Sequence, residues 1–513
     1  MHSYKNNRSK YSYFLLIFVA IKVGLNLLAI PHFGFHRDEL LHLALGDHLD
    51  WGFKEVPPFI ALIAKITTAV FGNSVFAARI FSTIFSGLII WFTGQIVIEL
   101  GGKKFAITLA CLALIFSPAF AASGYLFQPV VFDQLWWVLT VYLLIRYINT
   151  SLPVYIYLLG VVIGVGLLTK YTMAFFAIAL ILGLLFTKQR KILWNRHVLF
   201  AALIALVIFL PNIIWQMTHH LPIVTHMKTL RSEQLEYIKP SDFIKQQFLV
   251  NGIALFVWLV GLGFLLISAK LRRFQFLAFA FALVFIFLLY MKGKEYYLFG
   301  AYPMLFAAGA YGFERWTKAR AYTLRTVIVL LFTLPNLLLF PLALPILPLQ
   351  QTMTAFKLLH ITVKWEDQKE HYLSQDYADM LGWDEMTEKV AKAYNSLTPE
   401  QQKHTQIYAD NYGEAGAIHH IGKFYHLPDV ACLNSSFTLW TPDSLNARYI
   451  IYVDDTGGNN IKKFQSCIES YTKIGEVESP YARENGTGIF LLVNPKPELD
   501  EVYRKELAEK RLE

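Results

Sequence analysis

Long apolar runs recur from Tyr11 to about Pro348, with short polar stretches between them. Each run is close to the ~20 residues with which an α-helix crosses ~30 Å of hydrocarbon, so we predict about eleven transmembrane helices. A pattern of this kind is typical of an α-helical polytopic membrane protein. The approximate ranges are 12–31, 75–99, 105–122, 131–148, 153–168, 172–187, 197–216, 249–268, 274–291, 298–313 and 323–345.

Composition agrees with this pattern. Of the 513 residues, 55% are hydrophobic and 16% are charged, which is too apolar for an ordinary soluble enzyme and too long for one domain. The first apolar run is long, contains Lys22 and lacks a convincing small-residue cleavage site. We therefore expect it to remain as an anchor rather than to be removed as a signal peptide.

Lysine and arginine in the short loops predict the orientation, because cytoplasmic loops keep the excess of both. Counting crossings from a cytoplasmic N-terminus places the basic loops on one side. The net charge of +9 then faces lipid headgroups and requires no nucleic-acid partner. These basic segments are Lys5 to Lys10, 101–104, Arg146, 188–191, 269–273 and 314–320.

From about Gln350 the chain becomes mixed in charge, and short strand patterns alternate with helical ones. This alternation predicts a small soluble α/β layer on the extracytoplasmic side. We place the membrane domain at 1–349, its first outer loop at 32–74 and the C-terminal domain at 350–513. Cys432 and Cys467 both lie in the exported part, where an oxidising compartment permits a disulfide, and their pairing stays open. The predicted strands are 404–411, 428–434, 447–455, 472–479 and 488–494, and the helices are 414–427 and 460–470.

Charged and hydrogen-bonding side chains from segments far apart in the sequence collect on the predicted outer face. Charges near membrane depth are costly and usually face a cavity or a substrate path, so we expect a site there. An excess of lysine on the outer face opposes the topology rule and favours an anionic ligand such as a lipid phosphate. The competing interpretations are a solvated polar face, a snorkelling Lys170 and an interfacial belt of aromatics and cations. The candidates are Arg37, Asp38, Glu39, Glu55, Asp133, Lys170, Tyr171, Lys292, Lys294, Tyr297 and Tyr302.

The first outer loop predicts two helices in the membrane interface, one beginning near Arg37 and one spanning about 58–71. Asp38 and Glu39 are adjacent and cannot both face one point, so one is expected to be chemical and the other structural or helix-capping. Asp38, His42 and Glu55 are also candidate ligands of a divalent cation.

The stretches "FHRDELLHLALGDHLDWGFKEVPP" and "FGNSVFAARIFSTIFSG" resemble the first outer loop and second helix of bacterial glycosyltransferases of family 39. Relatives of that family include dolichyl-phosphate-mannose protein mannosyltransferases and the aminoarabinose transferase that modifies lipid A. The resemblance continues through "FDQLWWVLTVYLLIRY", "GLLTKYTM", "GKEYYLFGAYPMLFAAGA" and "NYGEAGAIHHIGKFYHLP", and covers nearly the whole chain. The commonest family pattern has an aromatic residue where this chain has His36, and Asp where it has Glu55. Both differences bear on metal use and on the choice of acceptor.

The resemblance implies a GT-C fold in the bacterial inner membrane, a polyprenyl-phosphate-linked sugar donor and transfer on the outer face. It also implies that Asp38, the first acid of the Asp-Glu pair, is catalytic. Inverting transfer needs a base near the acceptor hydroxyl, which Asp38 would supply, with Glu39 or Glu55 as its partner. The phosphate of the donor needs positive charge and hydrogen-bond donors, which the outer lysines, Tyr171 and Tyr297 would supply. The acceptor would be lipid A, another envelope glycan or a protein.

The alternative function is a transporter or flippase of a lipid-linked or anionic substrate. Transporters of this kind carry internal repeats and charges near the bilayer midplane. We find no internal repeat, and the charges concentrate at one predicted face.

Overall fold

The computed structural model describes residues 2–317 and 321–512. The chain divides into two compact units. We call the first, Met1–Ile30 with Arg79–Trp215 and Met227–Ile346, the membrane unit. The second unit combines Pro31–Ala78 and Gln216–His226 with Leu347–Glu513. The first outer loop thus packs with the C-terminal region, although more than 260 residues separate them in the sequence.

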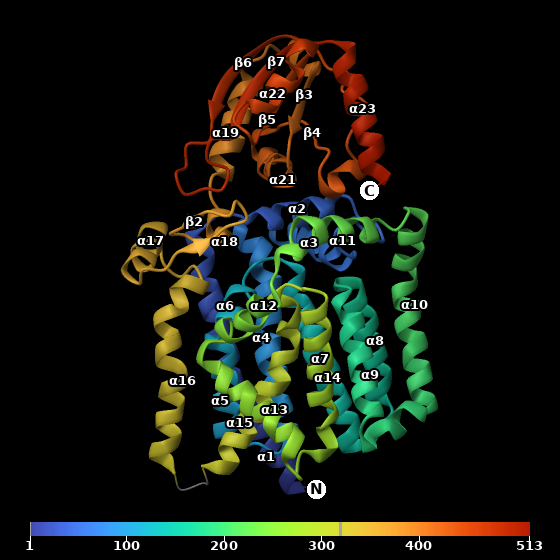
Figure 1. The fold of residues 1–513 in the computed structure, drawn as a ribbon, viewed down its shortest axis with the longest axis vertical. Coiled ribbons are helices and arrows are strands. Elements are labelled where there is room, and N and C mark those ends of the chain that lie inside the picture. Colours follow the sequence, from blue (N-terminus) through green and yellow to red (C-terminus); the bar gives the residue numbers. More distant parts are fainter. Residues whose placement is uncertain (1, 318–320, 513) are drawn as a thin grey trace. The chain divides into compact units, whose positions relative to one another are not determined.

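The membrane unit is helical, and its long helices run roughly side by side (Figure 1). Six helices among the described residues are long and apolar enough to cross a membrane, or up to eight if each of two bent pairs forms one span. The prediction of a polytopic helical membrane protein is confirmed. The helices are α1 (His2–Ala29), α4 (Val75–Leu100), α5 (Lys104–Phe116), α6 (Pro118–Ala122), α7 (Pro129–Thr150), α8 (Val154–Thr169), α9 (Thr172–Leu185), α10 (Arg196–Thr218), α12 (Pro240–Leu249), α13 (Leu255–Ile267), α14 (Phe276–Tyr290), α15 (Tyr302–Trp316) and α16 (Tyr322–Ala343).

These six to eight candidate spans are fewer than the apolar runs of the sequence, because several runs form shorter helices. The run at 105–122 breaks at Ser117, which is extended and precedes Pro118, so it forms the 13-residue α5 and the 5-residue α6. The run at 153–168 forms the 16-residue α8. A hydropathy pattern alone does not reveal where a helix breaks within an apolar run.

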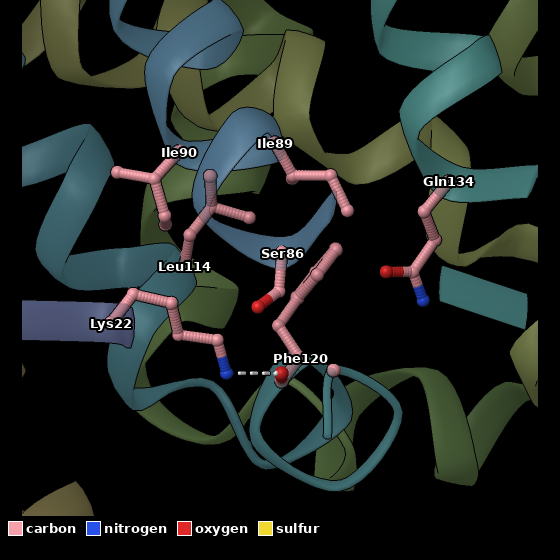
Figure 2. Close-up of a pocket in the computed structure, with 8 residues that line it drawn as sticks. Lys22, Ser86, Ile89, Ile90, Leu114, Phe120 and Gln134 are labelled. Atoms are coloured by element: carbon pink, nitrogen blue, oxygen red, sulfur yellow. Dashed lines mark hydrogen bonds between the residues drawn. The ribbon is translucent and has the colours of Figure 1, made fainter. Parts of the chain in front are cut away.

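Lys22 of α1 is 2% exposed, and its Nζ donates a hydrogen bond of 2.9 Å to the carbonyl of Phe120. Figure 2 shows this pair beside Ser86 and Gln134 in a cavity whose other labelled side chains are apolar. The cavity has a volume of about 10 Å³, which is room for roughly one water molecule. It is therefore too small for a sugar or a lipid headgroup.

The second unit contains a five-stranded sheet of order β4-β3-β5-β7-β6, in which β3 is parallel to β4 and β5, and β7 is antiparallel to β5 and β6. The predicted α/β domain is confirmed, and the two predicted loop helices are present as α2 and α3. The elements are α2 (Arg37–Asp47), α3 (Phe59–Phe71), α11 (Pro222–Glu233), α17 (Leu349–Leu358), β1 (Val363–Lys364), β2 (Glu370–His371), α18 (Gln375–Ala378), α19 (Trp383–Asn395), α20 (Pro399–Lys403), β3 (Thr405–Ala409), α21 (Tyr412–His420), β4 (Val430–Ala431), β5 (Tyr449–Asp454), α22 (Asn459–Phe464), β6 (Ile468–Glu476), β7 (Gly488–Pro495) and α23 (Pro497–Leu512).

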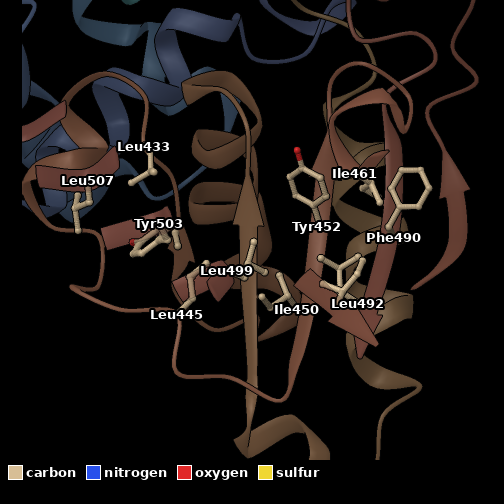
Figure 3. Packing of buried hydrophobic residues seen from close by; sticks show 12 residues of the cluster. Leu433, Leu445, Ile450, Tyr452, Ile461, Phe490, Leu492, Leu499, Tyr503 and Leu507 are labelled. Carbon is tan, nitrogen blue, oxygen red and sulfur yellow. The ribbon is translucent and has the colours of Figure 1, made fainter. Parts of the chain in front are cut away.

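One apolar core lies between the sheet and its helices (Figure 3). Leu499, Tyr503 and Leu507 recur every four residues along α23 and present one face of that helix to the core. Strand β5 contributes Ile450 and Tyr452 to the same core. This packing holds the loops that follow β3 and β5 on a rigid base.

The structure leaves Cys111, Cys432 and Cys467 as free thiols, so the disulfide left open by the sequence is not formed. Cys432 is fully buried, whereas Cys467 is partly exposed. The second unit is therefore held together by packing and hydrogen bonds, without a disulfide among its described residues.

Candidate active site

Helix α2 begins with a capping box that separates the roles of the two adjacent acids. The ring Nδ1 of His36 accepts a hydrogen bond of 3.1 Å from the Asp38 amide, and Glu39 Oε2 accepts one of 2.8 Å from the His36 amide. Glu39 is fully buried, while Asp38 is partly exposed. The structure therefore gives Glu39 the capping role and leaves Asp38 as the acid with access to solvent.

Asp38 is held by a tyrosine from the C-terminal region. The hydroxyl of Tyr412 donates a hydrogen bond of 2.9 Å to Asp38 Oδ1. Tyr412 is the first residue of α21, and Asn411 caps this helix by accepting hydrogen bonds from the amides of Gly413 and Glu414. The cap fixes the direction in which α21 starts, and so aims Tyr412 at Asp38.

Helix α21 approaches α2 closely because two of its residues have no side chain. A Cβ on Gly413 would lie 2.6 Å from Arg37 Cγ, and one on Gly416 would lie 2.9 Å from the main-chain carbon of Leu40. Both distances are shorter than a carbon–carbon contact allows. The glycines of "DNYGEAGA" therefore serve helix packing.

Arg37 lies against the same tyrosine from the other side. Its guanidinium carbon is 4.6 Å from the centre of the Tyr412 ring, and its Nη1 is 3.8 Å from Glu484 Oε1. The Arg37 amide also donates a hydrogen bond of 3.0 Å to the carbonyl of Asp379. Arg37 thus joins the start of α2 to three separate segments of the C-terminal region.

These neighbours set the charge of Asp38. Burial opposes its ionisation, but the electrostatic influence of the His36 and His42 side chains, the Tyr412 hydrogen bond and the charge of Arg37 together hold the pKa of Asp38 below its ordinary value. Asp38 is therefore a carboxylate at neutral pH. Nearby, burial raises the pKa of Asp379 to about 6, although the charges of Arg483 and Arg37 act to lower it.

Two other acids of the first outer loop have binding partners that are not part of the group around Asp38. Glu55 Oε2 accepts a hydrogen bond of 2.5 Å from Ser436 Oγ. Asp47 forms ion pairs with Lys423 at 2.5 Å and Lys65 at 3.5 Å. Both acids fasten the loop within the second unit.

The structure does not gather Asp38, His42 and Glu55 at the spacing of metal ligands. Among the described residues, the cluster with that spacing consists of Asp410, Asp454 and Asp455. The predicted ligand set is therefore not preformed.

In the membrane unit, Asp133 is a buried acceptor. It lies in the second turn of α7 and accepts hydrogen bonds from Trp137 Nε1 at 3.0 Å and Thr172 Oγ1 at 2.7 Å. The Trp137 ring stacks on Phe176 with centroids 4.1 Å apart. Asp133 thus ties α7 to the start of α9 and fixes the turn that carries Lys170.

Lys170 extends over two aromatic rings. Its Nζ lies 4.7 Å from the centre of the Tyr296 ring and 4.8 Å from that of Tyr297, and Lys294 Nζ lies 6.0 Å from the Tyr296 ring. Lys170 is within range of the charges of both Asp133 and Lys294. Two lysines from distant segments therefore lie near one ring, that of Tyr296, and this cationic group has the charge to bind a phosphate.

Three further predicted residues have other partners. Lys292 Nζ donates a hydrogen bond of 2.9 Å to the carbonyl of Glu236. Tyr171 donates one of 3.0 Å to Asn212 Oδ1, and the fully buried Tyr302 donates one of 2.6 Å to Gln247 Oε1. The structure places Tyr302 in the interior of the unit rather than at a surface.

Tyr412, Asp379 and Glu484 were not among the residues expected at the site. Tyr412 stands in the stretch "NYGEAGAIHHIGKFYHLP" that carries part of the family resemblance, so a signal was present. Asp379 and Glu484 stand in segments without a motif, and only their packing beside Arg37 identifies them.

The described geometry can be compared with known proteins. Residues 55–215 match the family model of dolichyl-phosphate-mannose-protein mannosyltransferases. The fold is similar to the crystal structure of ArnT from Cupriavidus metallidurans in the apo state, with a TM-score of 0.60 and 13% sequence identity over 93% of this chain and 97% of ArnT. The structure of the same ArnT bound to undecaprenyl phosphate matches with a TM-score of 0.61 and 12% identity over 94% of this chain and 98% of ArnT. No curated protein sequence matches this chain significantly.

These matches confirm the predicted resemblance over residues 55–215, and the GT-C fold over nearly the whole chain. The C-terminal region is included in the structural match, since more than nine tenths of both chains are covered.

Proposed function

We propose that this protein is a membrane glycosyltransferase that moves a sugar from a polyprenyl-phosphate donor, of the undecaprenyl-phosphate type, to an acceptor in the cell envelope. Transfer takes place on the outer face of the bacterial inner membrane, where the acceptor is lipid A, another glycan or a protein. The match to a mannosyltransferase family model and the ArnT-like fold support this class of reaction.

The observation that carries the proposal is the state of Asp38. Of the two adjacent acids, Glu39 is used in the helix cap, and Asp38 is partly exposed, ionised and oriented by Tyr412. A carboxylate fixed in this way can accept the proton of an acceptor hydroxyl as that oxygen attacks the anomeric carbon of the sugar. Inversion at that carbon follows from a single displacement.

The depressed pKa of Asp38 makes it a weak base, and the proposed reaction needs no stronger one. The bond that breaks joins the anomeric carbon to a phosphate oxygen, and its electron pair leaves on a phosphate that is already a weakly basic anion. The hydroxyl proton becomes acidic as its oxygen forms the new bond, and Asp38 receives it at that stage. A separate general acid is not required.

The cationic group of the membrane unit is proposed to bind the donor phosphate. Lys170 and Lys294 would supply positive charge, and Tyr297, whose ring centre is 4.8 Å from Lys170 Nζ, would donate a hydrogen bond to the phosphate. Lys292, which donates to a main-chain carbonyl, is assigned a lesser part. Tyr302 is proposed to stabilise the fold around this group instead of contacting the substrate.

The test is turnover by purified protein in nanodiscs with a panel of polyprenyl-phosphate sugars and an envelope-lipid extract. Wild type is compared with Asp38→Asn and with Asp47→Asn, a matched change at the other end of α2. We expect transfer by wild type and Asp47→Asn and none by Asp38→Asn. Full activity of Asp38→Asn would overturn the mechanism. Movement of labelled lipid across a sealed bilayer without turnover would favour a transporter.

A further inference from the structure

Three aspartates of the second unit meet outside the proposed active site. Asp410 follows β3 directly, Asp454 is the last residue of β5, and Asp455 comes next. One carboxylate oxygen from each lies within 4.8 Å of the others. A cation held at Ca–O distances of about 2.4 Å separates opposite ligand oxygens by up to about 4.8 Å, so this spacing suits a shared ion.

Asp454 lacks the partners that a buried carboxylate normally has. It is fully buried, its Oδ1 accepts hydrogen bonds from the Thr456 amide at 2.8 Å and hydroxyl at 2.5 Å, and its Oδ2 is buried without a hydrogen-bond partner among the described residues. A buried charged oxygen without a partner costs several kcal/mol of solvation free energy, roughly. A positively charged ligand at Asp454 Oδ2 would offset this cost.

Positive side chains do not fill that place. Among the side chains of residues 10–317 and 321–512, no lysine, arginine or histidine forms an ion pair with the carboxylates of Asp410, Asp454 or Asp455. The nearby Glu414 is also fully buried, and its Oε1 has no hydrogen-bond partner among the described residues.

The topology of the sheet brings these acids together. β3 and β5 are parallel neighbours, and the chain leaves β3 toward β4 on one side and β5 toward β6 and β7 on the other. The carboxyl ends of two such strands form a crevice where ligands commonly bind in open α/β sheets. The three aspartates stand at those carboxyl ends.

We propose that Asp410, Asp454 and Asp455 bind a hard divalent cation, Ca²⁺ or Mg²⁺, which prefers oxygen ligands of this kind. Binding also organises the turn that begins α21, because the Asp410 amide donates a hydrogen bond of 3.1 Å to Glu414 Oε2 within the cap of that helix. Tyr412 is two residues further on. The site is separate from the proposed catalytic carboxylate, and its ability to bind a cation does not depend on the proposed function.

The test uses the full-length protein in detergent after treatment with a chelator. Tb³⁺ is titrated while tyrosine is excited, since the Tyr452 hydroxyl lies 2.8 Å from both carboxylate oxygens of Asp410 and is placed to transfer energy to a bound ion. We expect saturable emission that Ca²⁺ or Mg²⁺ displaces, and the more effective competitor identifies the ion. The exposed Asp455→Asn is expected to weaken binding by about tenfold or more, while the exposed control Asp429→Asn leaves it unchanged.

Thermal unfolding gives an independent readout. The cation is expected to raise the unfolding midpoint of wild type and Asp429→Asn, and to raise that of Asp455→Asn far less. Asp454→Asn is a second variant, useful if it folds. Absence of saturable Tb³⁺ emission, lack of competition by both ions, or equal binding by wild type and Asp455→Asn would overturn the proposal.

Discussion

Tyr412 donates a hydrogen bond of 2.9 Å to Asp38, across 374 positions of the sequence. The contact gives the C-terminal region a direct part in the surroundings of the proposed catalytic acid. It also gives Asp38 a fixed partner whose removal is chemically simple.

Tyr412→Phe is expected to lower turnover roughly tenfold or more, because a hydrogen bond to a carboxylate contributes about 1.5–3 kcal/mol. It is also expected to raise the pKa of Asp38, which that hydrogen bond lowers. The acid limb of the pH–rate profile should therefore move to higher pH. The measurement is kcat/KM against pH, and an unmoved acid limb would show that Tyr412 does not act on Asp38.

Asp38→Asn is expected to change turnover, whereas Glu39→Gln is expected to change mainly stability. Asp38→Asn removes the proposed base, so turnover is lost while folding and donor binding persist. Glu39→Gln keeps a side-chain oxygen that can accept from the His36 amide, so it is expected to retain most activity and to lose about 1 kcal/mol of stability or less. Turnover and unfolding midpoints of both variants decide this. Inactive but stable Glu39→Gln would give Glu39 a chemical role.

Lys170→Ala is expected to raise the KM for the donor by about tenfold or more, since a charged hydrogen bond to a phosphate is worth about 1.5–3 kcal/mol. Lys170→Arg should recover part of the loss, because the charge returns with a different shape. Lys294→Ala is expected to behave similarly. The exposed Lys228→Ala serves as the control, and an equal rise in KM in that variant would point to a general charge effect.

The stability of the second unit is expected to fall as pH rises from about 4 to about 6. Burial raises the pKa of Asp379 from 3.8 to about 6, so the folded state holds a proton there that the unfolded state has released. The stabilisation from this proton is complete below pH 4 and is lost as pH passes 6. The loss is at most roughly 3 kcal/mol, from a shift of about two units.

Asp379→Asn should flatten this part of the stability curve. Fluorescence of Trp383, whose indole nitrogen donates a hydrogen bond of 2.8 Å to the Asp379 carbonyl, offers a nearby probe of unfolding. Asp384→Asn in the following helix is a poor control because burial also raises the pKa of that group, so Asp429→Asn is preferred. An unchanged slope in Asp379→Asn would assign the pH dependence to other groups.

Local sequence patterns were enough to predict the helical membrane character, the α/β nature of the C-terminal region and the importance of the first outer loop. These features rest on local information: apolar runs of membrane length, strand and helix periodicity, and the acids after the first span. The order of motifs also sufficed for the family resemblance, which the match over residues 55–215 confirms.

Which residues share a site depends on how the helices and strands pack in three dimensions. The capping box assigned Glu39 to structure, and packing of α21 on α2 brought Tyr412 to Asp38. The structure also shows that Tyr302 is fully buried and that the carboxylates of the aspartates after β3 and β5 lie close together. Contacts between segments hundreds of residues apart leave no local pattern in the chain, because they depend on how complete helices and strands pack together.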